Sequence, residues 1–184
     1  TSVAVFRIEQ DNLAQADIGY FVPGVTPPAQ AYYGAEGATS KGFELEVTGA
    51  ILPDWNATAG YTQFEATDAK GTDVNTLYPT RLLRLFTTYK LPGALDKLTV
   101  GGGVNWQAEI YTSATNPAGV SERITQKAYS LVNLMARYDI SRQLSAQVNV
   151  SNATDETYFD VFDAYGALTY GAPRGITGAL KYKF

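Results

Sequence analysis

Alternation of apolar and polar residues with a period of two runs through most of this 184-residue sequence and constrains its fold most strongly. Successive side chains of an extended strand point to opposite faces, so each alternating segment predicts a strand with one apolar face and one polar face. We expect eight strands, over residues 1–10, 39–51, 55–66, 79–91, 98–110, 128–140, 144–150 and 176–184. Several of them approach the roughly 9–11 residues that cross a bilayer at a tilt.

The connections between these segments alternate strictly between short and long. Short turns are expected at 52–54, 92–96 and 141–142, and long loops at 11–38, 67–78, 112–122 and 152–168. If consecutive strands are antiparallel, every long loop lies on one side, as in outer-membrane barrels with short periplasmic turns and long external loops. Any single one of these strands would also fit a soluble β-sandwich. A sandwich, however, gives no reason for long and short connections to lie on opposite sides. The sequence therefore predicts an all-β, antiparallel transmembrane β-barrel.

Composition excludes several classes of function. The sequence has no Cys and no His, which excludes disulfides, the usual zinc sites and His-based catalytic triads. Its net charge of −4 argues against a nucleic-acid partner. No run of about 18 apolar residues is present, so a membrane helix is not expected, whereas membrane strands need no such run. Without an initial Met or a signal segment, the chain is expected to be mature, trimmed or a fragment.

The final segment ends on an aromatic residue that is also the last residue of the sequence. Leu180, Tyr182 and Phe184 fall on one face of this strand, and Lys181 and Lys183 on the other. This ending resembles the terminal strand of bacterial outer-membrane barrel proteins. The resemblance implies contact with outer-membrane lipid and recognition of Phe184 by the barrel assembly machinery.

Four further stretches point together to one family. They are residues 40–46 (SKGFELE), 91–103 (LPGALDKLTVGGG), 129–138 (YSLVNLMARY), and 150–158 (VSNATDETY) followed by 170–174 (YGAPR). In order and spacing they resemble TonB-dependent ferric-siderophore receptors, in particular the hydroxamate and pyoverdine type. The resemblance covers nearly the whole chain from residue 39 onward. One departure is Ala153-Thr154, where such receptors commonly carry Leu-Phe or Val-Phe.

The resemblance implies a larger protein than these residues. Such receptors are barrels of about 22 strands with a plugged lumen, and the plug is a separate N-terminal domain that carries the TonB-binding segment. Residues 1–184 are then the eight C-terminal strands of the barrel domain, without the signal, TonB-binding segment and plug. Eight strands can also close by themselves as a small barrel. The interior of a closed eight-stranded barrel is narrow and packed by side chains. Small inward residues such as Gly101, Gly103 and Thr58 instead favour the wide lumen of a larger barrel.

The implied function is uptake of a ferric siderophore across the Gram-negative outer membrane, energised by the TonB complex. Transport of this kind needs no enzyme activity. It also needs no bound cofactor or protein metal ligand, since the iron is carried as a chelate wrapped by the siderophore's own oxygens. A passive porin or a small structural barrel is the alternative function. A barrel enzyme is disfavoured because no His is present to serve as a base.

Aromatic residues in the long connections are the candidates for siderophore contact, because a Tyr ring offers a flat face and a hydroxyl. Tyr111 is the first candidate, because its place in the strand alternation directs its side chain inward at the rim of the lumen. Tyr78, Tyr165 and Tyr170 follow as further candidates. Packing within the loops is the alternative role for each of them.

Inward-facing charged residues are expected to hydrate the lumen and to hold the plug. This set is Glu44, Glu46, Arg84, Lys90 and Arg137. The spacing of Glu44 and Glu46 would also suit a catalytic carboxylate pair. We favour a lumen position for both, opposite a cation such as Arg7 or a residue of the plug.

Overall fold

The computed structural model describes residues 1–11, 13–35, 37–115, 118–162 and 168–184. They form two compact units, which are considered separately. The first, called the sheet unit below, comprises Thr1–Ala4, Glu44–Gln63 and Thr76–Phe184, and the second comprises Val5–Phe43 and Phe64–Asn75. No helix in these described ranges is long and apolar enough to cross a membrane.

Eight strands form one sheet, which confirms the all-β prediction. In sheet order they are β1 (Ser2–Gln10), β4 (Ala38–Leu52), β5 (Trp55–Asp68), β6 (Arg81–Lys90), β7 (Leu98–Gln107), β10 (Tyr129–Asp139), β11 (Leu144–Ser151) and β14 (Gly175–Tyr182). The pairs from β5–β6 through β11–β14 are antiparallel. The order starts at β1 and ends at β14, so the described strands form an open sheet with two edges and not a barrel closed by eight strands.

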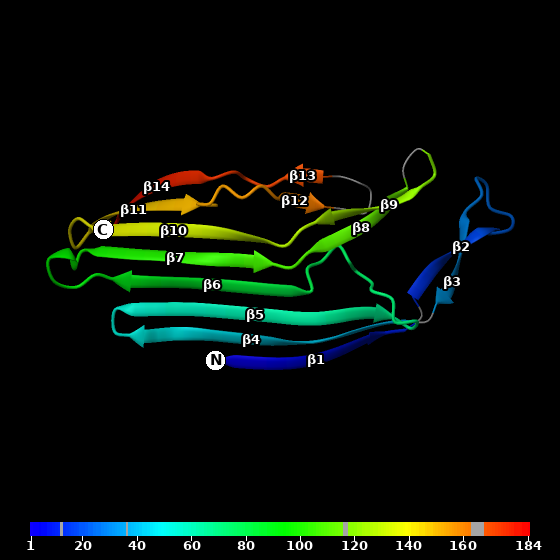
Figure 1. Ribbon diagram of the computed structural model, residues 1–184, viewed down its shortest axis with the longest axis horizontal. Helices are drawn as coiled ribbons and strands as arrows, with labels where there is room; N and C mark the ends of the chain where they lie inside the picture. Colours follow the sequence, from blue (N-terminus) through cyan, green and yellow to red (C-terminus); the bar gives the residue numbers. More distant parts are fainter. Residues whose placement is uncertain (12, 36, 116–117, 163–167) are drawn as a thin grey trace. The chain divides into compact units, whose positions relative to one another are not determined.

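Three of the four long connections contain a two-stranded hairpin. These hairpins are β2–β3 (Leu13–Phe21, Gln30–Ala35), β8–β9 (Ile110–Thr115, Ser121–Gln126) and β12–β13 (Phe159–Phe162, Leu168–Tyr170). The sequence predicts loops here because these stretches do not alternate regularly, but pairing within a hairpin satisfies the backbone without an apolar face. In the sheet unit, β8–β9 and β12–β13 lie at the end of the sheet opposite the short turns (Figure 1).

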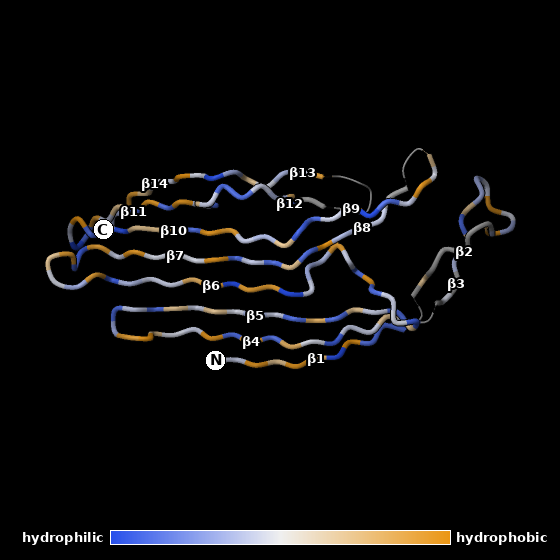
Figure 2. The backbone as a smooth tube through the Cα atoms, viewed as in Figure 1, coloured by the Kyte–Doolittle hydropathy of each residue, from blue (hydrophilic) through white to orange (hydrophobic). Residues whose placement is uncertain are grey.

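The register of the sheet unit aligns residues of equal parity into continuous rows. One row runs from Leu85 through Val104 to Val132, across β6, β7 and β10. The row on the other face runs from Lys90 through Thr99 to Arg137. Hydropathy alternates along these strands accordingly (Figure 2). The sheet therefore has one apolar face and one polar face, and these two names are kept below.

The sheet has almost no buried apolar core. Among the described residues, the buried apolar side chains are Ala66, Ala108 and Ile110. On the apolar face, by contrast, Leu134 is 49% exposed and Leu180 is 75% exposed. Soluble monomers rarely expose contiguous apolar surface of this extent. Lipid is the solvent that suits this face.

Aromatic residues border the apolar face at both ends. Trp55 and Tyr182 lie toward the short turns. Toward the opposite end, Tyr61 and Trp106 lie in one row, on either side of Leu83. The indole nitrogen of Trp55 donates a hydrogen bond of 2.7 Å to the Thr87 hydroxyl. This arrangement is typical of the aromatic girdles of membrane barrels.

Replacement of Gly103 by Ala is expected to destabilise the barrel. A methyl group there would clash with the Leu85 carbonyl oxygen and lie 2.9 Å from Phe86 Cδ2, whereas one at Gly60 would meet no atom within 4 Å. Overpacking of this kind costs about 1–3 kcal/mol. Urea unfolding of the full receptor should show a lower midpoint for Gly103→Ala than for Gly60→Ala. Equal midpoints would contradict the close strand approach at Gly103.

Candidate functional site

The polar face carries all five charged residues that the sequence assigns to the lumen. The register of β6, β7 and β10 places Arg84, Lys90 and Arg137 on this face. Glu44 and Glu46 share the parity of Thr48 along β4, and the Thr48 hydroxyl bonds to that of Thr58 on the same face at 3.4 Å. All five are exposed. Arg7, expected as a partner of the two glutamates, forms its ion pair with Glu9.

A cluster of one aromatic and two charged residues is built on the β8–β9 hairpin and on Glu109, the residue directly before β8. Arg123 lies opposite Ser113, and its guanidinium carbon is 3.5 Å from the centre of the Tyr111 ring. Arg123 Nη2 is also 3.0 Å from Glu109 Oε1. A guanidinium over a ring face is held by cation–π attraction, and an ion pair fixes its orientation further. The cluster presents a phenol hydroxyl and guanidinium donors side by side.

A second aromatic cluster lies at the base of the β12–β13 hairpin. The rings of Phe159 and Tyr170 stack with their centres 4.9 Å apart, and those of Tyr129 and Tyr158 stack at 4.8 Å. The buried side chain of Gln126, at the end of β9, accepts a hydrogen bond of 2.8 Å from the Phe159 backbone N–H. The two hairpins are therefore joined at their bases.

The four predicted tyrosines do not form one group. Tyr111 lies beneath Arg123, Tyr170 stacks on Phe159, and Tyr78 is 65% exposed. Within the described part of the chain, no ring contact joins Tyr78, Tyr111 and Tyr170 to one another. Tyr165 lies outside the described residues. Siderophore contact by these four tyrosines stays a prediction.

Arg123 is a candidate site residue that no sequence pattern singles out. It follows a stretch expected to be a loop, and only the pairing of β8 with β9 brings it over Tyr111. The sequence signal is Gly119, because Gly readily adopts the positive φ that a tight turn between two short strands requires, and its φ in the structure is 81°.

Asn152 organises the connection that leads from β11 to β12–β13 and back to β14. It is 4% exposed and adopts a positive φ of 47°, a conformation that Asn tolerates. Its side-chain amide donates to the carbonyl oxygens of Glu156, at 2.8 Å, and Ala172, at 3.2 Å. Its side-chain oxygen accepts a 2.9 Å bond from the Glu156 backbone N–H. One side chain thus ties both ends of this connection together.

Replacement of Asn152 by Ala should loosen the β12–β13 hairpin. Three hydrogen bonds of a buried side chain are lost, each worth about 1 kcal/mol, so we expect a local destabilisation of about 3 kcal/mol. Limited proteolysis of the full receptor should then cut the hairpin faster. Asn105→Ala, which removes an exposed Asn of β7, is the matched control. Equal cleavage rates in the two variants would rule out this role for Asn152.

Metal-binding side chains are not gathered in the described ranges. No group of three or more Asp or Glu residues there is arranged to hold a metal ion. The two clusters at the end of the sheet opposite the short turns (Figure 1), called the outer end below, offer instead stacked rings, hydroxyl groups and a guanidinium. Groups of these kinds suit a polar ligand that has flat apolar parts.

Comparison with known proteins gives the family. The family profile "TonB dependent receptor-like, beta-barrel" matches residues 1–153. The ferripyoverdine receptor of Pseudomonas aeruginosa is 40% identical over 185 residues, which cover 100% of this chain and 23% of the receptor. The ferric-pyoverdine BN7/BN8 receptor of Pseudomonas putida is also 40% identical, and the match covers 100% of this chain and 20% of that receptor. The chain thus spans no more than a quarter of the length of these curated relatives.

Solved structures agree with this match. The pyoverdine outer membrane receptor FpvA from P. aeruginosa PAO1, bound to pyoverdine, superposes with a TM-score of 0.90 at 40% identity, over 99% of this chain and 27% of that receptor. The FpvAI–pyocin S2 complex gives a TM-score of 0.90 at 41% identity, over 99% of this chain and 25% of the matched chain. With its exposed apolar face and alternating connections, this chain therefore belongs to the TonB-dependent receptor β-barrel family and forms part of an outer-membrane barrel.

Proposed function

We propose that the receptor containing this chain takes up a ferric siderophore of the pyoverdine class across the Gram-negative outer membrane, with energy from the TonB complex. The observation that carries the proposal is the 40% identity over the full chain to two receptors named for ferric pyoverdine. The match extends through the outer hairpins as well as the sheet. The receptor moves its ligand without changing a covalent bond.

In this proposal, residues 1–184 are the C-terminal segment of the barrel domain. The remaining strands, the plug, the TonB-binding segment and the signal precede Thr1. Two observations support this organisation. The chain matches only 20% and 23% of the length of its two relatives, and edge strands β1 and β14 carry backbone groups that need partners inside a membrane.

The ligand is recognised at the outer end of the sheet unit. Tyr111 and Arg123 contact the chelate through a ring face and guanidinium donors, and Tyr170 with Phe159 supplies a second aromatic surface. Tyr78 and Tyr165 complete the contacts from neighbouring connections. The iron keeps the siderophore's oxygens as its ligands, so the receptor supplies none.

The polar face lines the lumen in this proposal. Glu44, Glu46, Arg84, Lys90 and Arg137 keep the lumen hydrated and hold the plug through charge contacts, as their exposure on one face of the sheet suggests. A TonB-driven change in the plug then opens a path for the chelate.

Binding to the purified full receptor tests the ligand assignment. The double variant Tyr111→Ala/Arg123→Ala should bind iron-labelled ferric pyoverdine about tenfold more weakly, because it removes an aromatic contact and a charged donor. Tyr138→Ala, on the apolar face near the short turns, is the control and should bind like the unaltered receptor. Unchanged affinity in the double variant would remove this cluster from the binding site.

A further inference from the structure

A groove of about 610 Å³ lies on the apolar face of the sheet unit, toward the end with the short turns. It is lined by the end of β4, the start of β5, and β6, β7 and β10. The side chains that line it are all uncharged, and they are Leu52, Trp55, Thr87, Tyr89, Val100 and Leu134. The groove therefore suits an uncharged, apolar occupant.

Strand register explains why the apolar face is hollow at this place. Gly102 of β7 lies opposite Thr87 of β6 on one side and Leu134 of β10 on the other. Gly102 has no side chain and that of Thr87 is short, so the surface is low here. A methyl group on Gly102 would lie 3.1 Å from Leu134 Cδ2, which makes Leu134 one wall. Trp55 and Tyr89 lie opposite each other in the next row toward the short turns and form a second wall.

Hydrogen bonds hold the indole ring in the second wall. The indole N–H of Trp55 donates a bond of 2.7 Å to the Thr87 hydroxyl, which donates one of 2.9 Å to the backbone carbonyl oxygen of Asn56. The donors of both side chains are thus already used. Protein interfaces carry about one hydrogen bond per 100–200 Å². Trp55 and Thr87 instead offer an occupant a surface for van der Waals contact.

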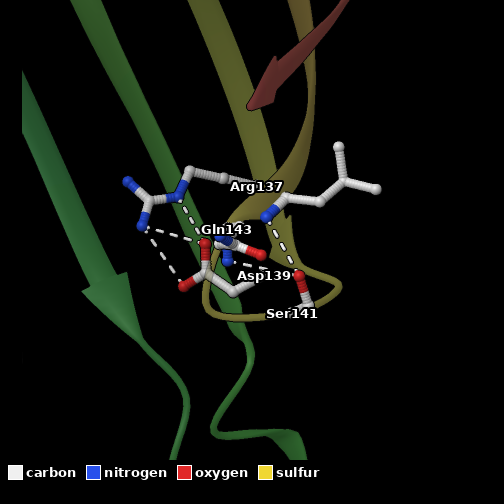
Figure 3. Close-up of polar contacts among 5 residues, drawn as sticks. Arg137, Asp139, Ser141 and Gln143 are labelled. Carbon is white, nitrogen blue, oxygen red and sulfur yellow. Dashed lines mark hydrogen bonds and ion pairs between the residues drawn. The ribbon is translucent and has the colours of Figure 1, made fainter. Parts of the chain in front are cut away.

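The strand β10, which forms the other wall, is held at its short-turn end. On the polar face, Arg137 donates two hydrogen bonds to the Asp139 carboxylate, from Nε at 3.0 Å and from Nη2 at 3.2 Å. The Ser141 hydroxyl accepts bonds from the backbone N–H groups of Gln143, at 3.2 Å, and Leu144, at 3.0 Å (Figure 3). These bonds fix the β10–β11 turn and the adjoining strand end, so this wall is preformed.

We propose that the groove binds one acyl chain of a phospholipid from the periplasmic leaflet of the outer membrane. The groove is continuous with the face that meets lipid, and the short turns of such barrels lie on the periplasmic side. Trp55 belongs to the aromatic girdle, which lies at headgroup level. The row of Gly102 lies about 7 Å farther along the strands, so a chain that starts at the girdle passes over Gly102 as it enters the membrane.

Packing holds the chain in this site. Lipid tails and the apolar face are equally apolar, so no water is excluded when a tail enters the groove, and van der Waals contact with the walls is the attraction. An empty groove would forfeit these contacts. Lipid beside the flat part of the face lacks them as well, as at Gly178, where a methyl group would meet no atom within 4 Å. The groove therefore orders one chain among the many that touch the barrel.

Photolabelling of the full receptor tests this site, in vesicles of phosphatidylethanolamine and phosphatidylglycerol. The phosphatidylethanolamine carries a diazirine near the ester end of one acyl chain, and mass spectrometry measures the lipid attached at Thr87 and Tyr89. Val100→Phe places a ring in the groove and should lower this labelling about fivefold, because the chain loses its contact with the walls. Val148→Phe is the matched control. Val148 lies in the row of Val100, through Ala136, but outside the groove, so the labelling should stay unchanged.

Competition and a second variant complete the test. An excess of unlabelled phosphatidylethanolamine should displace the label, whereas displacement by lipid A alone would assign the groove to another lipid and overturn the proposal. If Val100→Phe loses the heat-resistant form, Leu134→Ala removes a wall instead and should also lower the labelling, with Leu180→Ala outside the groove as its control. Labelling that neither groove variant changes would mean bulk lipid only. Photolabelling needs no siderophore, so this failure is distinct from failure of uptake.

Discussion

Replacement of residues 112–124 by a short Gly-Ser linker in the full receptor is expected to abolish ferric-siderophore uptake while the barrel stays heat-resistant. The replacement removes most of the β8–β9 hairpin, including Arg123 above the Tyr111 ring. The barrel should survive because β8 and β9 pair only with each other and contribute no strand to the eight-stranded sheet. Uptake of iron-labelled siderophore by cells and heat-modified gel mobility measure the two effects.

The matched control inserts the same linker after Gly119, between β8 and β9. This variant lengthens the hairpin but keeps its pairing and the Tyr111–Arg123 contact. We expect it to transport siderophore at nearly the unaltered rate. If the receptor without residues 112–124 transports equally well, ligand capture does not occur at this hairpin.

Replacement of Val148 by Arg should have the second large effect, on the stability of the barrel. Val148 is 48% exposed on the apolar face and lies in mid-strand, opposite Ala136 and Gly178. An Arg on the lipid face near the bilayer midplane costs about 2–4 kcal/mol. We expect a lower urea midpoint and less folded receptor in the membrane.

Asn149→Arg is the control at almost the same depth but on the polar face. Asn149 lies opposite Met135 and Thr177 and accepts a hydrogen bond of 2.8 Å from Gln147. Losing this bond should cost about 1 kcal/mol, well below the cost of Val148→Arg. Equal destabilisation by both variants would mean that the apolar face does not meet lipid.

The two faces of the sheet could be predicted from sequence because side-chain direction in a strand depends only on parity. Leu85 and Val104, for example, were separate members of two alternating segments, and the register joined them into one row. The same rule put Arg84, Lys90 and Arg137 on the polar face. Alternation assigns faces only to the strands that are present, so it gives no information about further strands of a barrel. The prediction of a larger barrel depends on the family resemblance.

The outer hairpins and the contacts within them could not be predicted in the same way. Ser121–Gln126 is mostly polar and shows no apolar stripe, so apart from the preceding Gly119 nothing local distinguishes it from a loop. The approach of Arg123 to Tyr111 depends on pairing across the hairpin. The role of Asn152 depends on Glu156 and on Ala172, which is 20 residues away. Long-range geometry of this kind is not encoded in any short pattern.

Uptake of iron-labelled ferric pyoverdine by cells that carry the full receptor, with and without a functional TonB, tests the central claim most directly. The account predicts uptake that requires both the receptor and TonB. Uptake that continues at the same rate without TonB would indicate a passive pore, and a receptor that takes up no ferric siderophore would contradict the proposed function.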